Sequence, residues 1–497
     1  MTDYSVFPDP TYRDTVLAPL FEGVKAHYAG HMSALNQAHL VMLADTGILP
    51  RVEAQKIAEA LRAIDAEIDI SALTYTGEVE DYFFLVEAEL KRRLGDLGGA
   101  LHTARSRNDM DHTLFKLALR TRTSALLDLA LELAERMIGK AEVEKETLIV
   151  VYTHGQPAQP STYGHYLGAA IEVLLRDIAR LNAAAEGLEH CPMGAAAITT
   201  SGFPIDRGRV SDLLGFEKPL LNSYGCIASV DYVTSLYSAM KLLFLHLGRL
   251  IQDMQFWTAF EVGQLYVPNS LVQISSIMPQ KRNPVPIEHL RHLASATVGQ
   301  CDAIVGVMQN TPFTDMNDSE GEVQALGYAA FERGGRVLSL LGALIPACRV
   351  NAERVQKTSD AACITITELA DTLVREEGLT FRQAHEIAAA TARAVIAEGV
   401  SLGQGAKAFR NAFAASVGRS PEMDDAAFAT AVSPETFIAR RDRLGGPAPT
   451  VLTHALSHYR EETASLRAKA LTRADRHHTA DEERHTAFEA LLRGDHG

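Results

Sequence analysis

The sequence lacks excess positive charge, paired cysteines and long apolar runs. Its 497 residues carry a net charge of −15, which argues against a nucleic-acid or membrane-surface partner, because either would require a basic face. The five cysteines show no CxxC spacing, and their odd number suits a reducing compartment. The start Met1–Tyr4 has no basic segment followed by an apolar one, and no run approaches the ~20 apolar residues of a membrane helix. These absences favour a cytoplasmic protein.

Patterns of cofactor and metal sites are also missing. No G-x-G-x-x-G opens a helix after a strand, which weakens every dinucleotide interpretation. His477, His478 and His485 lie near the C-terminus and His289 lies near His292, but neither group has H-E-x-x-H order or neighbouring Cys or Asp ligands. We expect solvated or packed histidines there, and catalysis without a metal or an organic cofactor.

Apolar residues recur at helical spacing over most of the chain. This pattern runs from Asp14 to Leu94 and is broken at Gly47–Pro50, as a turn would break it. It predicts an all-α fold of three helical domains. The expected boundaries are 1–104 for an N-terminal domain, 105–360 for a central bundle of long helices, and 361–497 for a C-terminal domain with a charged tail.

One apolar seam inside the central domain has steps that alternate between three and four residues, which predicts a helix with one buried edge. The seam consists of Leu236, Met240, Leu243, Leu247, Leu250 and Met254. A stripe of this length is expected to seek partner helices from other subunits, which predicts a homotetramer.

The first of three polar strings covers residues 275–283. It lies between an apolar segment and a helix that Pro284 can begin, since proline at the first turn gives up no needed N–H. The N–H groups of such a loop, with Lys281 nearby, form a positive site for a carboxylate and ease ionisation of a serine hydroxyl. The alternative is an ordinary polar turn.

The second string is His102-Thr-Ala-Arg-Ser-Arg-Asn-Asp109. Ser106 or Asn108 can cap the helix that follows, which is also the plain structural alternative for the string. Arg105 and Arg107 are spaced by one residue and cannot share a helical face. One of the two arginines is therefore free to point at a ligand.

The third string surrounds Thr153 and His154, where a glycine and two prolines stop a helix and leave an ordered loop. A lone histidine at such a place is more often a capping or packing residue than a catalytic one.

Together the three strings resemble the signatures of the fumarase/aspartase superfamily, most of all its argininosuccinate lyase branch. The matching segments are S-S-x-M-P-Q-K-x-N-P from Ser275, the string from His102, and Thr-His-x-Gln-Pro-Ala-Gln-Pro from Thr153. Ile274 and Ala104 stand where the family has glycine. The resemblance implies four subunits that pool their long helices into one bundle, with each active site formed where three chains meet.

The resemblance also implies a reaction and a role for each residue. The reaction is the reversible anti β-elimination of fumarate from a succinyl compound through an aci-carboxylate. The implied catalytic residues are Ser275 as the base, Lys281, and His154 with its partner Glu288. The implied substrate-binding residues are Ser106, Arg107, Asn108, Thr153, Ser276, Met278 and Asn283.

Departures from the family pattern concern the half of the substrate that leaves as an amine. They lie near Glu22, at 224–231 and at 311–320, where a lysine-containing run of argininosuccinate lyases is missing. A site that keeps the residues facing the fumarate half and changes those facing the amine half should keep the reaction and act on a different substrate. We therefore expect an N-substituted L-aspartate, an aminopolycarboxylate such as ethylenediamine-disuccinate, with argininosuccinate as the alternative. Interpretations of other classes are a non-catalytic, crystallin-like structural protein and a helical interaction scaffold.

Overall fold

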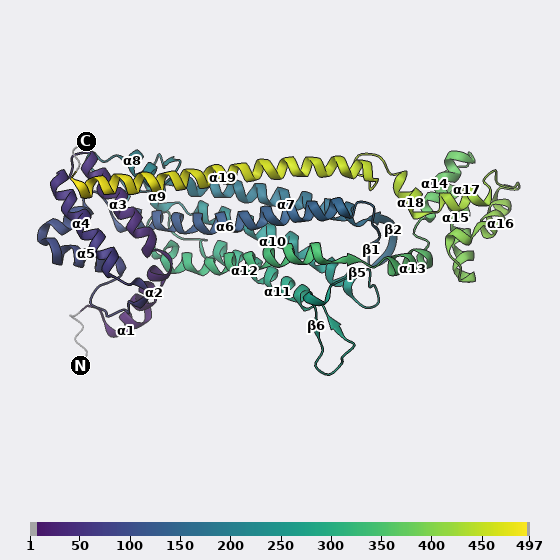
Figure 1. Cartoon of the computed structure of the whole chain (residues 1–497), viewed down its shortest axis with the longest axis horizontal. Helices are drawn as coiled ribbons and strands as arrows, with labels where there is room; N and C mark the ends of the chain where they lie inside the picture. The colour runs from purple at the N-terminus through teal and green to yellow at the C-terminus, as the bar shows by residue number, and fades with distance from the viewer. Residues whose placement is uncertain (1–6, 495–497) are drawn as a thin grey trace.

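Long helices running side by side along the molecule form its central bundle (Figure 1). The computed structural model describes residues 7–494. The bundle helices are α6 (Arg107–Val143), α7 (Tyr163–Glu186), α10 (Asp231–Thr258), α11 (Val285–Val307), α12 (Gly321–Ala347) and α19 (Pro449–Arg493). The predicted all-α architecture is confirmed.

Shorter helices cover the end of the bundle at which α6 begins. They are α1 (Pro10–Tyr12), the π-helical turn η1 (Arg13–Leu17), α2 (Ala18–His27), α3 (Ala29–Asp45), α4 (Arg51–Glu67), η2 (Ile70–Ala72), α5 (Tyr82–Leu94), η3 (Gly95–His102), α8 (Arg207–Leu213) and α9 (Ser223–Ala228). The turn predicted at Gly47–Pro50 is confirmed, because Gly47 adopts a φ of 70° between α3 and α4. Helices of this end and of the bundle share one apolar core, which runs from Phe21 to Leu491.

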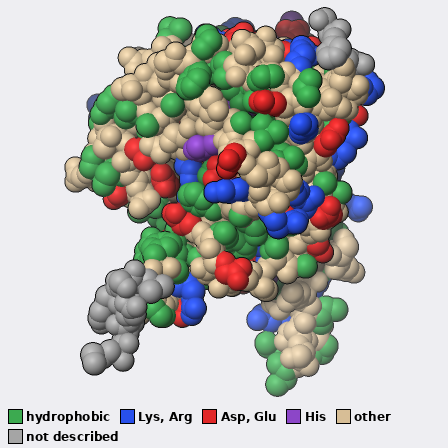
Figure 2. All heavy atoms as spheres, turned by 90° about the vertical axis from the view of Figure 1, so that its left-hand side faces the viewer, with side chains coloured by type: hydrophobic (Ala, Val, Ile, Leu, Met, Phe, Trp, Pro, Cys, Tyr) green, Lys and Arg blue, Asp and Glu red, His purple; other side chains and the backbone are tan. Residues whose placement is uncertain are grey.

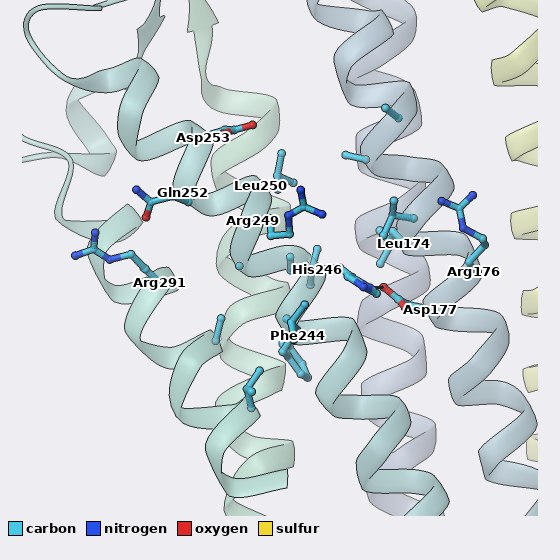
Figure 3. A pocket seen from close by; sticks show the side chains of 18 of the residues that line it. Leu174, Arg176, Asp177, Phe244, His246, Arg249, Leu250, Gln252, Asp253 and Arg291 are labelled. Carbon is cyan, nitrogen blue, oxygen red and sulfur yellow. Dashed lines mark hydrogen bonds and ion pairs between the residues drawn. The ribbon is translucent and has the colours of Figure 1, made fainter. Parts of the chain in front are cut away.

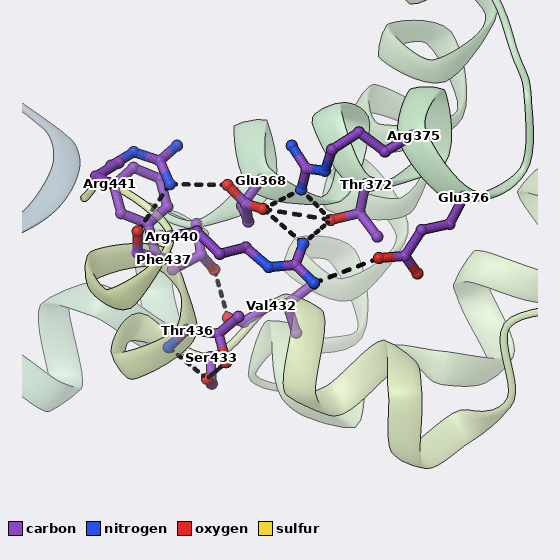
Figure 4. Close-up of polar contacts among 11 residues, drawn as sticks. Glu368, Thr372, Arg375, Glu376, Val432, Ser433, Thr436, Phe437, Arg440 and Arg441 are labelled. Carbon is purple, nitrogen blue, oxygen red and sulfur yellow. Dashed lines mark hydrogen bonds and ion pairs between the residues drawn. The ribbon is translucent and has the colours of Figure 1, made fainter. Parts of the chain in front are cut away.

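A second core lies at the opposite end, within residues 363–432. The helices beyond the bundle are α13 (Ala352–Ala362), α14 (Ile366–Glu376), α15 (Phe381–Glu398), η7 (Leu402–Gln404), α16 (Ala406–Val417), α17 (Asp425–Ala431) and α18 (Pro434–Ala439). The buried Glu368 joins α14 to the end of α18, because its carboxylate accepts from Arg440 Nη1 at 2.9 Å and from Arg441 Nη1 at 2.7 Å (Figure 4).

Within residues 7–494, strands occur as four short pairs. They are β1 (Leu148–Thr153) with β2 (Gln156–Thr162), β3 (His190–Cys191) with β4 (Lys218–Pro219), β5 (Leu265–Tyr266) with β8 (Arg349–Val350), and β6 (Gln273–Ile274) with β7 (Arg282–Asn283). Short 3-10 turns complete the fold at η4 (Gly187–Glu189), η5 (Asn269–Leu271) and η6 (Asn317–Ser319). The β1–β2 and β6–β7 pairs are hairpins that carry two of the three polar strings.

The apolar seam of α10 does not need a partner subunit. Its six residues, Leu236 to Met254, are between 0% and 7% exposed within a single chain. The helices α11 and α7 pack against α10, and the seam residues lie in the main core. The prediction that this seam seeks helices of other subunits is therefore wrong, because the chain itself supplies the helices that cover it.

The range 361–497, predicted as one C-terminal domain with a charged tail, contains two different parts. Residues 363–432 form the second core, whereas α19 turns back along the bundle and buries Leu456, Phe488 and Leu491 in the first core. Figure 1 shows this helix along the upper edge of the bundle. Within residues 7–494, no helix is long and apolar enough to cross a membrane.

Candidate active site

The second string begins α6, the longest helix of the bundle. Ser106 caps it, because the Ser106 Oγ accepts from Asn108 N–H at 3.4 Å and Asp109 Oδ1 accepts from Ser106 N–H at 2.9 Å. This capping box confirms the predicted cap. Before it, Arg105 is buried under α3, where its Nη1 donates to Asn36 Oδ1 at 2.8 Å. Ala104, at a family glycine position, has a φ of 61°.

Arg107 is surrounded by carboxylates. Its Nη2 lies 2.6 Å from Asp81 Oδ2 and 3.4 Å from Asp111 Oδ2, and its Nη1 lies 3.7 Å from Glu80 Oε1. Burial alone would lower the pKa of Arg107, but Asp111 and Asp81 hold that pKa above its ordinary value. Burial raises the pKa of Asp111 to about 7. A substrate carboxylate that binds Arg107 therefore competes with carboxylates of the chain.

Asn108 and Asp109 hold the loop formed by residues 194–197. Asp109 Oδ2 accepts from Gly194 N–H at 2.8 Å and from Ala196 N–H at 2.9 Å, while Asn108 Nδ2 donates to Ala197 O at 3.1 Å. Asp109 is fully buried, and this burial raises its pKa to about 6. The loop fixes the side-chain amide of Asn108, the predicted binder of a succinyl carboxylate.

Two segments that depart from the family pattern lie at the same end of the bundle. The rings of Tyr224 on α9 and Phe313 are 5.9 Å apart and tilted by 31°. Asp315 and Glu320 lie within electrostatic reach of Arg107, and burial raises the pKa of both carboxyls. The structure thus brings segments 224–231 and 311–320 near the second string. Figure 2 shows this end of the molecule, with acidic and basic side chains mixed over its surface.

The third string forms the tip of the β1–β2 hairpin. Thr153 pairs with Gln156, so His154 and Gly155 are the two turn residues. Their φ values of 53° and 73° are both positive, as a two-residue type I′ turn requires. Thr153 and His154 are exposed, and the positive φ of His154 follows from the turn that it forms.

The first string forms the β6–β7 hairpin, which projects from the side of the bundle (Figure 1). Arg282 anchors its base through Nη2, which donates to Val267 O and Asn269 Oδ1 at 2.8 Å each. At the tip, Ser275 Oγ accepts from Met278 N–H at 3.1 Å and from Ile277 N–H at 3.4 Å. Ile277 is 83% exposed, so the tip extends into solvent from the isolated chain.

Ile274, the other residue at a family glycine position, lies in strand β6 opposite Arg282. The φ of Ile274 is not in the left-handed region, so the backbone of the hairpin does not require glycine at this position. Lys281 follows the tip, and its backbone N–H donates to Met278 O at 2.9 Å. Glu288 lies in the first turn of α11 and is exposed. Within the described part of the chain, no hydrogen bond or ion pair joins Glu288 to His154.

The three strings are far apart in one chain. The second string begins α6, and the β1–β2 hairpin follows its end; with 37 residues, α6 spans roughly 55 Å. The β6–β7 hairpin projects between these two ends (Figure 1). A substrate the size of a succinyl compound cannot touch all three strings of the same chain.

No sequence motif points to Asp81, which caps α5 and pairs with Arg107 at the start of α6. Asp109 was visible only as part of the second string, although the S-x-x-D spacing with Ser106 signals a capping box. Among the described residues, no group of three or more His, Cys, Asp or Glu side chains could hold a metal ion. His289 Nδ1 and His292 Nε2 lie 3.0 Å apart on the exposed side of α11.

A groove between α7, α10 and α11, with a volume of about 1020 Å³, contains none of the predicted site residues (Figure 3). On its floor, His246 Nδ1 donates to Asp177 Oδ2 at 2.7 Å, and Arg180 also pairs with Asp177. Apolar and charged side chains share its walls, including Leu245, which is 41% exposed.

Comparison with known protein families gives two matches along the chain. A family described as Lyase matches residues 24–299, and one described as Argininosuccinate lyase C-terminal matches residues 363–439.

Individual relatives extend this similarity over nearly the whole chain. Argininosuccinate lyase 2 of Agrobacterium fabrum is 59% identical over 471 residues, which cover 94% of either chain. Argininosuccinate lyase of Methanothermobacter thermautotrophicus is 34% identical and covers 87% of this chain and 92% of that protein. Among solved structures, an EDDS lyase variant with bound fumarate has a TM-score of 0.83 at 27% identity, covering 98% of this chain and 96% of that one.

Proposed function

The chain belongs to the argininosuccinate lyase branch of the fumarase/aspartase superfamily, and from this we propose that it reversibly eliminates fumarate from an N-substituted L-aspartate. It is a carbon–nitrogen lyase that releases fumarate. Its substrate is taken to be an aminopolycarboxylate, such as ethylenediamine-disuccinate.

The observation that carries the proposed chemistry is the tip of the β6–β7 hairpin. Two backbone N–H groups donate to Ser275 Oγ, which lowers the free-energy cost of ionising this hydroxyl. Lys281 adds a positive charge to the same hairpin. Ser275 is thereby suited to remove a weakly acidic proton from the carbon β to the amine.

The reaction requires stabilisation of a second negative charge on the neighbouring carboxylate. When Ser275 takes the proton, the bonding electrons move into this carboxylate to give the aci-carboxylate, which Lys281 and Asn283 hold. Fixed donors at such a group each contribute about 10²–10³ in rate. The C–N bond then breaks, fumarate forms, and the amine leaves with a proton delivered through His154, which Glu288 orients.

The other strings bind the substrate. Ser106, Asn108 and Thr153 donate hydrogen bonds to the carboxylates of the succinyl half. The guanidinium of Arg107 binds a carboxylate there too, in competition with its ion pair to Asp81. The remaining contacts come from Ser276 and Met278 at the hairpin tip.

Other copies of the chain are needed to complete this site, and we place it in a homotetramer. The support for this is the distance between the three strings along the bundle. Within one chain, no string lies close enough to the other two to share a substrate with them. The groove between α7, α10 and α11 offers a mixed apolar and charged surface on which helices of a second copy can pack.

The choice of amine rests on the segments near Arg107. Segment 311–320 lacks the lysines of the corresponding run in argininosuccinate lyases and carries the carboxylates of Asp315 and Glu320, and Tyr224 and Phe313 add an aromatic wall. Similarity to EDDS lyase over nearly the whole fold supports an amine of the ethylenediamine kind. Argininosuccinate is the second candidate, favoured by the relative of that name at 59% identity.

The two candidates are separated by running the reaction towards the adduct. Fumarate is supplied with ethylenediamine, with arginine and with ammonia in separate reactions, and its absorbance is followed. We expect consumption of fumarate with ethylenediamine. Consumption with arginine alone would establish the second candidate, and no consumption with any of the three would count against an aminopolycarboxylate and argininosuccinate alike.

A further inference from the structure

The carboxyl-terminal half of α19, residues 473–493, ties the bundle to the end of the molecule that holds the second string. Phe488 and Leu491 are each 4% exposed and lie in the main core. Gln55 Nε2 on α4 donates to Leu492 O at 3.1 Å, and Arg62 on the same helix pairs with Glu489. This segment, which the sequence analysis treated as a charged tail, is an integrated part of the fold.

Its polar contacts converge on one buried carboxylate. Glu189 Oε2 accepts from Arg476 Nη2 at 2.7 Å and from His477 Nε2 at 2.9 Å, and the Glu189 side chain is 3% exposed. Burial alone would raise the pKa of Glu189, but His477, Arg120 and Arg476 hold it below its ordinary value. Both hydrogen-bond donors come from α19, whereas Arg120 on α6 acts on Glu189 only through its charge, so α19 supplies the direct partners of this carboxylate.

The backbone next to these contacts is closely packed. Gly215 has a φ of 71°, and a Cβ placed there would lie 3.1 Å from both Ala480 Cβ and His477 Cα. Arg476 Nε also donates to Gly215 O at 3.3 Å. Helix α19 thus packs directly against the chain around Gly215, which lies beside Glu189.

The segment from Glu189 to Ala197 leads to the second string. Lys116 Nζ on α6 donates to Gly187 O and His190 O at 3.0 Å each, which fixes the start of the segment. At its far end, Asp109 holds the N–H groups of Gly194 and Ala196, and Ala197 O receives Asn108 Nδ2. The segment thus connects Glu189 to the carbonyl, eight residues further along the chain, that accepts from Asn108 Nδ2.

We propose that residues 473–493 act as a strap whose Arg476 and His477, through Glu189, position Asn108 for the succinyl carboxylate. Arg476, His477 and Glu189 are positioning residues and touch no substrate. The assignment of Asn108 to the substrate rests on the proposed function, whereas the contact path from Arg476 to Asn108 does not.

The test compares two arginines of α19 that are about equally exposed, Arg476 at 31% and Arg467 at 30%. Arg467 Nε donates to Glu135 on α6 at 2.7 Å, away from the 189–197 segment. In Arg476→Ala, amide hydrogen exchange over residues 192–197 is expected to become about fivefold faster or more, the lower end of coupling between linked sites. Arg467→Ala is the matched control and should leave this exchange unchanged.

Kinetics supply a second readout in the adduct-forming direction, with the amine that the three-amine experiment selects. The KM for fumarate is expected to rise about fivefold or more in Arg476→Ala with a smaller change in kcat, because Ser275 lies on a separate hairpin. Arg476→Lys keeps the charge and should stay close to wild type. If Arg476→Ala does not fold, Glu189→Gln, which keeps the shape and removes the charge, is measured in the same way.

The outcomes separate the strap from the proposed function. A folded Arg476→Ala or Glu189→Gln protein with wild-type exchange at 192–197 would overturn the strap, as would equal changes in the Arg467→Ala control. A wild-type protein that consumes no fumarate would instead overturn the proposed function, and the exchange measurement would still decide the strap.

Discussion

Two residues of the candidate site hold backbone conformations that residues with a Cβ seldom adopt. Ala104 lies within the second string with a φ of 61°, and His154 forms the tip of the β1–β2 hairpin with a φ of 53°. Such conformations cost about 1–3 kcal/mol each and persist where the surroundings impose them. At Ala104 the surroundings include Arg105, which is fixed by Asn36, and His39, whose Nε2 donates to Thr103 O at 3.0 Å.

The strain at Ala104 predicts a stabilising substitution. Ala104→Gly relieves a left-handed conformation worth about 1–2 kcal/mol and loses part of this to the greater freedom of glycine in the unfolded chain. The expected net gain in the free energy of unfolding is about 1 kcal/mol, measured as a shift of the thermal midpoint. Ala100→Gly is the control, because Ala100 has no positive φ, and it should lower the midpoint. A loss of stability in both variants would contradict the strain.

Ser275 is the residue on which the proposed chemistry depends most. Ser275→Ala removes the base and should lower kcat by about 10²-fold or more, the lower range for positioned acid–base groups. Circular dichroism should remain that of the wild type, because the hydroxyl accepts its two bonds at an exposed hairpin tip. Ser270→Ala, an exposed serine just before the hairpin, should keep wild-type kcat. Near wild-type turnover of Ser275→Ala would remove Ser275 from this role.

At the scale of elements, the beginning of α6 carries charged side chains that are buried, which is unusual for a helix. The positive end of the helix dipole favours carboxylates there, and the capping box uses Asp109. Burial nevertheless raises the pKa of Asp109 to about 6 and that of Asp111 to about 7. The desolvation of these carboxylates outweighs the favourable dipole, so this turn stores a free-energy cost at neutral pH.

This cost predicts a pH dependence for Asp111→Asn. The folded-state pKa of Asp111, about 7, lies above its ordinary value of 3.8, so the wild type loses stability as the pH rises between these two values. The asparagine variant does not titrate there. Its stability relative to wild type should therefore increase by about 1 kcal/mol per pH unit across this window and level off above it. Thermal midpoints of both proteins at pH 5 and pH 8 measure the difference, and parallel behaviour would contradict it.

The sequence predicted those elements whose signals are local. Ser106 as a helix cap and the break at Gly47 were readable from neighbouring residues. The pairing of Asp81 with Arg107 joins positions 26 residues apart and depends on how α5 packs beside α6. The return of α19 was missed because its buried residues, such as Phe488 and Leu491, are sparse among charged and alanine residues. Hence the three polar strings could be identified in the sequence, whereas the residues that hold them in place could not.

For the whole molecule, the position of the strings matters more than their composition. One chain presents the second string at one end of the bundle, the His154 hairpin at the other, and the Ser275 hairpin on the side between them (Figure 1). The hairpin tip exposes Ile274 at 71% and Ile277 at 83%, an apolar surface that packing against another copy would cover. Light scattering is expected to return a tetramer at micromolar concentration, and a monomer would contradict a shared site.

A shared site also predicts that two inactive variants restore activity in each other. Ser275→Ala lacks the base and Asn108→Ala lacks a carboxylate binder, so each alone should show little turnover. After dissociation and reassembly of a mixture, some sites take the Ser275 hairpin from one variant and the second string from the other, and both are then wild type. Fumarate absorbance should show activity above that of either parent. A mixture of Ser275→Ala with the double variant Ser275→Ala/Asn108→Ala contains no wild-type Ser275 hairpin and should stay inactive. If mixed tetramers form and the first mixture still stays inactive, the Ser275 hairpin and the second string must act in a site formed by a single chain. The bundle would then have to move so that the two strings, which lie far apart along α6, come together.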